Sequence, residues 1–273
     1  MQDIQKLIAI KSKKGQRAIQ LVDQNFRNNE VSRDNQLYHE IIEGKVEDDL
    51  DGAYVLLNTD PSNRNYRNIK NKLREKLLNH LFFLDYSKPS ETLYKQIFYE
   101  CTREAFQINV LMLEEEYELA YKKAQDTLSK AEEYELWNIA INCLAVIRQS
   151  YSESGNIKGV KETNHKIGLA REKANIIDQA KSKYYSIITE LNRSLTAQKK
   201  ELENLPSEIK YFEELLEKNH LIQIELLYYN LKLLNNQFHK DFMANILLTD
   251  QIEKKYLNRP VDLIKVYLDP QRI

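Results

Sequence analysis

The chain has 273 residues, 30% of them charged, with only six glycines and five prolines. Its 40 basic and 41 acidic residues leave a formal net charge of −1, which excludes the broad positive field of a protein that binds nucleic acid or anionic membrane over its whole surface. A β-sandwich or doubly wound sheet of this length needs more turn residues, so the composition predicts an all-α protein of long amphipathic helices.

Residues 1–88 are predicted to form a separate N-terminal helical module. Its first helices are expected over residues 4–13, 16–26, 34–44 and 48–57, with no visible repeat. Asp60-Pro61-Ser62-Asn63 predicts a turn, because proline presets φ and the polar side chains bond nearby backbone amides. A basic amphipathic helix is expected after this turn, over residues 62–85.

Residues 61–76 carry six basic side chains against a single acidic one. At 100° per residue, Arg64, Arg67 and Arg74 fall on one flank of the helix, and two lysines fall on the other. Such a flank could contact phosphates as a helix-turn-helix does, or face an acidic protein, or only border the apolar face and extend into water. The candidate basic patch consists of Arg64, Arg67, Lys70 and Arg74.

Two Arg-to-His pairs, Arg33 with His39 and Arg74 with His80, have the spacing R-x5-H. This spacing resembles the active-site pattern of helical prokaryotic ribonucleases, which implies an Arg and a His that act together on the scissile phosphate. Chance alone supplies about one such pair in this composition. The sequence holds no zinc motif, phosphate-binding glycine loop or nucleophile elbow, so we predict no enzyme activity, no cofactor and no metal site.

Residues 89–273 are predicted to form an array of helical hairpins. Placing Tyr117 over Ile157 also places Ala120 over Val160, an interval of 40 residues that indicates a weak internal repeat. Further along, a long polar helix is expected over residues 176–205, followed by a break at Leu205-Pro206-Ser207. A short C-terminal helix over residues 261–268 is expected to cap the array.

Two segments resemble the turn into helix B of tetratricopeptide repeats (TPR). They are Glu116-Tyr117-Glu118-Leu119-Ala120 and Gly155-Asn156-Ile157-x-x-Val160, within residues 92–174. Asn164 stands where that family has an aromatic residue, and Arg148 where its helix A has a small one. The resemblance implies a TPR-like α-solenoid, a right-handed stack of antiparallel helix pairs whose concave surface binds a peptide or partner domain.

Polar residues of the expected A helices are candidates for contacts to such a partner, namely Arg103, Asn109, Asn142 and Arg148. The leading hypothesis is therefore a protein–protein interaction scaffold or adaptor. The alternative is a bacterial-type transcription regulator, in which residues 61–76 contact DNA and the array senses a peptide or dimerises; a ribonuclease is a distant third. With no signal peptide and no membrane-spanning stretch, we expect a cytoplasmic protein with a protein partner or a second copy of itself.

Overall fold

The computed structural model describes residues 32–80 and 93–256, which form ten helices and contain no strand. The predicted all-α class is thus confirmed for the described part of the chain. The chain divides into two compact units, Met1–Asp85 and Tyr86–Ile273. Several predictions concern residues outside the described ranges: the helices over 4–13 and 16–26, the end of the basic helix after residue 80, and the capping helix over 261–268.

Unit 1 contains the helices α2 (Arg33–Ile42), α3 (Asp49–Leu57) and α4 (Arg64–His80). The two later helices begin at capping side chains. The Asp48 carboxylate accepts hydrogen bonds from the first amides of α3, and the Asn63 side-chain oxygen accepts one from Asn65 N in α4 at 2.8 Å. A small core holds the three helices together, and its buried residues are Leu37, Val46, Ala53, Tyr66 and Leu73.

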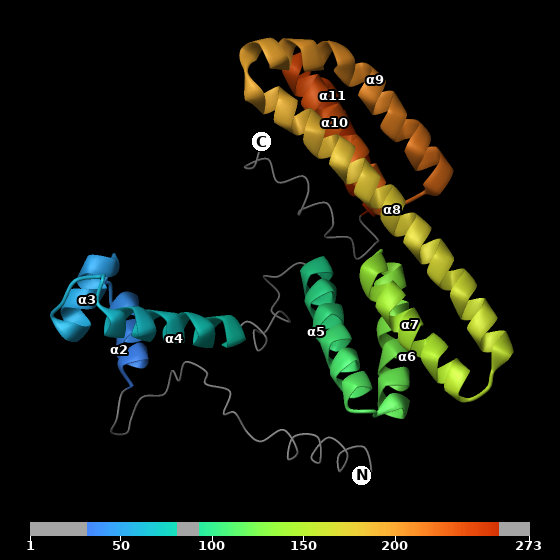
Figure 1. The fold of residues 1–273 in the computed structure, drawn as a ribbon. Helices are drawn as coiled ribbons and strands as arrows, with labels where there is room; N and C mark the ends of the chain where they lie inside the picture. The colour runs from blue at the N-terminus through green and yellow to red at the C-terminus, as the bar shows by residue number, and fades with distance from the viewer. Residues whose placement is uncertain (1–31, 81–92, 257–273) are drawn as a thin grey trace. The chain divides into compact units, whose positions relative to one another are not determined.

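Unit 2 begins with α5 (Leu93–Leu113), α6 (Tyr117–Glu133), α7 (Trp137–Glu153) and α8 (Ile157–Arg193). Consecutive helices pack side by side, and α7 contacts α5 as well as α6 (Figure 1). The α6 residues Ala120, Ala124 and Ala131 are fully buried, so small side chains allow its neighbours to approach closely. Cys101 and Cys143 are buried free thiols whose pKa values are raised by burial, as expected for core residues.

The same turn joins these four helices three times, at Glu115, Glu135 and Gly155. Each of the three residues has a positive φ, of 63°, 54° and 70° respectively. In each turn the amide of the next residue bonds to a carbonyl five positions back, for example Leu136 N to Ala131 O at 2.7 Å. This is the Schellman pattern, which satisfies the last carbonyls of a helix. It reverses the chain every 20 residues, so one hairpin recurs every 40.

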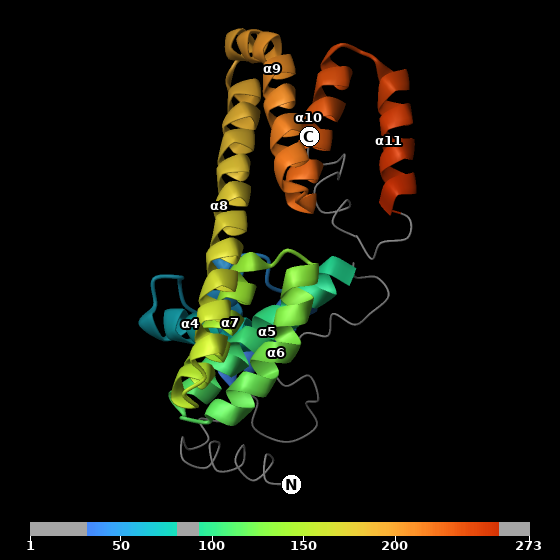
Figure 2. The same ribbon diagram turned by 90° about the vertical axis from the view of Figure 1, so that its right-hand side faces the viewer.

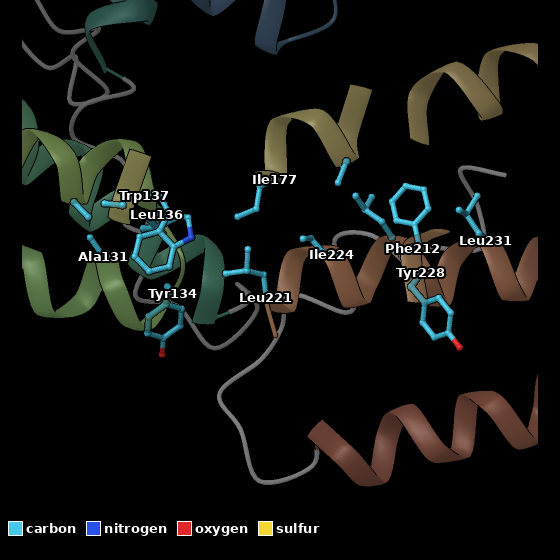
Figure 3. Close-up of a cluster of buried hydrophobic side chains, with 14 of the residues drawn as sticks. Ala131, Tyr134, Leu136, Trp137, Ile177, Phe212, Leu221, Ile224, Tyr228 and Leu231 are labelled. Carbon is cyan, nitrogen blue, oxygen red and sulfur yellow. The ribbon is translucent and has the colours of Figure 1, made fainter. Parts of the chain in front are cut away.

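The helix α8 has 37 residues and continues past α7. Around its second half pack α9 (Leu195–Asn219) and α10 (Ile222–Phe238), and α11 (Phe242–Tyr256) packs against α10 (Figures 1 and 2). Residues 223–228 of α10 are all buried, because this helix is covered by neighbours on most of its circumference. The core of unit 2 runs continuously from Trp137 to Phe212 and Leu231 (Figure 3).

The predicted break at Leu205-Pro206-Ser207 and the helix over residues 176–205 were wrong. The α8 helix starts at Ile157 and ends at Arg193, Ser194 is extended (φ −163°), and Pro206 lies inside α9. Proline removes one helical hydrogen bond, but Leu205 beside it is fully buried, so packing against the neighbouring helices outweighs the local cost. The α9 helix bends in its first half (Figure 2), as expected for a helix that contains proline.

None of the described helices combines the length and the apolar character needed to cross a bilayer.

Candidate functional site

A pocket of about 210 Å³ lies in unit 2, where the first turns of α5 and α7 meet the middle of α8 and the start of α10. Its lining includes Tyr94 and Phe98 of α5, stacked with 6.2 Å between ring centroids, and the charged Asp178 and Lys181 of α8. Sites for small molecules usually have ~300–1,000 Å³. This pocket is smaller than that range and has about the size of a single side chain.

Glu135 lines the pocket and links two parts of unit 2 that are far apart in sequence. Its carboxylate accepts hydrogen bonds from Ile222 N at 2.9 Å and Gln223 N at 3.1 Å. Its backbone oxygen accepts a third from Gln223 Nε2 at 3.0 Å. The N-cap residue of α10, Leu221, offers no side-chain bond. Glu135 therefore caps α10 from another helix turn, 87 residues away.

Burial controls the charges around this cap. Burial raises the pKa of Glu135, although hydrogen bonds from the two amides and the charge of Lys173 act in the opposite direction. Burial also lowers the pKa of Lys181, whose Nζ donates to Gln223 Oε1 at 2.7 Å. The polar lining of the pocket is thus a network in which Gln223 bonds to both the acid Glu135 and the base Lys181.

Trp137, the single tryptophan of the chain, lines the same pocket and is 9% exposed. The ammonium of Lys173 lies 4.3 Å from the centre of its rings. Its indole N–H has no hydrogen-bond partner among the described residues. The nitrogen is on the edge of the ring that faces Ile177 and Leu221 (Figure 3). A buried donor without an acceptor is a group that a bound carbonyl or carboxylate could satisfy.

The four predicted contact residues do not form one site. Asn142 Nδ2 of α7 donates to Asn109 Oδ1 of α5 at 3.2 Å, so these two lie together. Arg103 lies over the ring of Tyr99, 5.7 Å from its centre, about 120° around α5 from Asn109. Arg148 points to the other side of α7, toward α8.

Arg148 links α7 to α8 through a side-chain hydrogen bond. Its Nη1 donates to Asn164 Oδ1 at 3.1 Å.

An exposed apolar row on α5 was not predicted from the sequence. Phe98, Phe106 and Leu113 are 48%, 55% and 82% exposed. Their spacing places them on one side of α5, the side on which Asn109 reaches α7. The sequence does indicate this row, because these apolar residues fall outside the buried stripe of Cys101, Ile108 and Leu111. The row was missed because apolar residues are abundant all around α5.

In unit 1 the structure separates the predicted basic patch into two kinds of residue. Lys70 Nζ lies 2.8 Å from both carboxylate oxygens of Asp49. Arg64, Arg67 and Arg74 are exposed, and their guanidinium groups make no hydrogen bond or ion pair with the described residues. Only the three arginines are therefore available to a partner.

The Arg-to-His pairs gain no support from the geometry. Arg33 and His39 both lie on α2, where a spacing of six residues places them about 120° apart. The His39 ring packs edge-on against Tyr38, with 5.5 Å between ring centroids. His80 ends α4, and its side chain lies outside the described part of the structure. No group of acidic, histidine or cysteine side chains suited to a metal occurs among the described residues.

Comparison of the chain with protein-family models, with curated proteins and with solved structures found no match.

Proposed function

We propose that the chain is a helical-repeat scaffold whose unit 2 binds an extended segment of a partner protein. The binding surface is the α5–α7 face, defined by Phe98, Phe106, Asn109 and Leu113 of α5 with Asn138, Asn142 and Gln149 of α7. The pocket at one end of this face receives one side chain of the partner as an anchor.

The proposed architecture is a TPR-like array in which α5–α6 and α7–α8 are successive hairpins and α5 and α7 are the A helices. Two features support it: the recurrence of one turn type every 20 residues and the contact of α7 with both α5 and α6. The hairpin of 40 residues is longer than the 34-residue TPR unit. Unit 1 is proposed to be a separate helical module that precedes this array.

One observation carries the proposal: Phe98 belongs both to the pocket and to the exposed apolar row of α5. A partner segment could therefore bury one side chain in the pocket while its next residues cover Phe106. Beside this row, the bonded Asn109 and Asn142 retain amide groups for the backbone of an extended segment. Interfaces commonly combine such an apolar anchor with polar groups around it.

Selection of displayed peptides from the native proteome on the purified protein would test this proposal. The test variant is Phe106→Glu, which places a charge at the centre of the α5–α7 face. Leu169→Glu is the matched control, because Leu169 is similarly exposed (46%) on α8. Peptides selected by the wild type should bind Phe106→Glu at least tenfold more weakly and the control unchanged. Equal binding to both variants would place the site elsewhere.

Trp137 provides a second readout. Because it is the single tryptophan and lines the pocket, a peptide that anchors there should change its fluorescence emission. A peptide that binds with no change in Trp137 emission would not use the pocket.

A further inference from the structure

We propose that α4 of unit 1 is a second binding surface, which takes the phosphate backbone of duplex DNA on Arg64, Arg67 and Arg74. This surface is independent of the α5–α7 face.

The lysines and arginines of α4 differ in whether they form ion pairs within unit 1. All three lysines pair with acids of the same unit: Lys70 with Asp49 at 2.8 Å, Lys72 with Asp34 at 3.2 Å, and Lys76 with Asp34. Asp34 is 3% exposed, so two of these pairs are part of the packing between α2 and α4. Their charge is balanced inside the unit.

The three arginines of α4 are exposed and form no ion pair with the described residues. They lie at positions i, i+3 and i+10 of α4, which places them within an arc of about 80° on one exposed flank of the helix, beside the core face formed by Tyr66 and Leu73. At a rise of about 1.5 Å per residue, they span about 15 Å along the helix axis. The guanidinium fork suits phosphate oxygens better than an ammonium does. The exposed surface of α4 thus carries three arginines suited to phosphate oxygens, against one exposed acidic residue, Glu75.

The composition between the arginines favours a nucleic acid over an acidic protein. The exposed residues from Arg64 to Arg74 include Asn65, Asn68 and Asn71 and no large apolar side chain; Leu77 and Leu78 become exposed only beyond them. Protein–protein interfaces have an apolar core, whereas protein–DNA interfaces are more polar and more positive. Arginine and asparagine also form the common contacts to phosphates and base edges.

The shape of the surface favours duplex DNA among nucleic acids. An α-helix about 10–12 Å wide fits the major groove of B-DNA, which is about 12 Å wide. The corresponding groove of duplex RNA is too narrow for side chains to read. Binding of single strands relies on stacking of bases on exposed aromatic rings. The tyrosine of α4, Tyr66, is buried instead, and its hydroxyl donates to Asp49 at 2.9 Å.

Fluorescence anisotropy of a labelled 20-base-pair duplex with the full chain, over about 50–200 mM salt, tests the proposal. Three neutralised phosphates predict a slope of about −2.7 for log K against log salt. Replacing all three arginines with Gln should weaken binding more than tenfold, and a single Arg67→Lys should retain most of it. The matched control replaces three exposed cations of α8, Lys161, Lys166 and Arg171, with Gln, and should bind within twofold of the wild type.

Several outcomes would overturn the proposal. Equal loss in the α4 and α8 triple variants, with unchanged circular dichroism, would show that binding follows net charge alone. Polyglutamate that competes as well as duplex DNA, with the same dependence on the arginines, would assign the surface to an acidic protein. A single strand or an RNA duplex that binds more tightly would assign it to another nucleic acid. Absence of DNA binding at 50 mM salt would also reject it.

Discussion

Glu115 and Glu135 have the same backbone conformation and different surroundings. Both occupy the left-handed region at a Schellman turn, where glycine is the least strained residue. We expect Glu115→Gly to stabilise unit 2 by about 0.5–1 kcal/mol, because glycine adopts this conformation without strain and the exposed Glu115 side chain loses no buried contact. Glu135→Gly relieves the same strain but removes the cap of α10, so it should destabilise by about 1–2 kcal/mol. Urea unfolding followed by Trp137 fluorescence measures both, and stabilisation by Glu135→Gly would contradict the role of the cap.

Asp34 is a buried acidic residue of α2 that forms ion pairs with Lys72 and Lys76 of α4. Burial acts to raise the pKa of Asp34, but the bonds to Lys76 and Lys72 outweigh it and hold this pKa below the ordinary 3.8. The stability that this lowered pKa contributes is present above about pH 4 and is lost as the pH falls through the lowered pKa.

Asp34→Asn should destabilise unit 1 by about 3–5 kcal/mol at neutral pH, because it leaves the buried Lys76 without its opposite charge. Hydrogen exchange measured by mass spectrometry should show faster exchange in α2 and α4. Exchange in α6 serves as the reference within the same sample. Unchanged protection of α4 in the variant would show that the ion pair contributes nothing to stability.

At the scale of an element, α8 contains two glycines that should respond oppositely to alanine. A Cβ at Gly168 meets no atom within 4 Å, whereas a Cβ at Gly159 would lie 2.7 Å from the ring of Tyr151. Gly168→Ala should stabilise the protein by about 0.5–1 kcal/mol through helix propensity. Gly159→Ala should destabilise it by about 1–3 kcal/mol, since the Tyr151 ring must move. Thermal unfolding followed by circular dichroism compares the two, and equal shifts would refute the close contact.

The elements also show where local sequence signals are sufficient. The turn at residues 60–63, the start of α3 after Asp48 and the turn at Gly155 were read correctly, because capping side chains and a left-handed residue act within a few positions. Pro206 was misread as a helix end. The unfavourable effect of proline on a helix is local and can be predicted from sequence. The burial of Leu205 against other helices depends on the tertiary structure and cannot.

At the scale of the whole molecule, Glu135 connects the hairpins of unit 2 to its C-terminal helices, and this connection should depend on pH. Because burial raises its pKa above the ordinary 4.5, folding favours the protonated acid. The wild type should therefore gain stability, relative to Glu135→Gln, as the pH falls through the raised pKa toward about 4.5. Urea unfolding of both proteins at pH 7 and pH 5, followed by Trp137 fluorescence, measures this difference. If the stability difference between the two proteins is the same at both pH values, folding does not change the pKa of Glu135.

The sequence alone determined the all-α class, the approximate starts of α2, α3 and α4, the 40-residue interval and the common flank of Arg64, Arg67 and Arg74. These follow from periodicity, capping and turn chemistry, which depend on residues close together in the chain. Only the tertiary structure decided that Lys70 pairs with Asp49, that Arg148 bonds to Asn164, and that Glu135 caps α10. It also placed the half-exposed Phe98 in the lining of a pocket. Each of these depends on which helices become neighbours, a choice made by burial of the whole core rather than by any local segment.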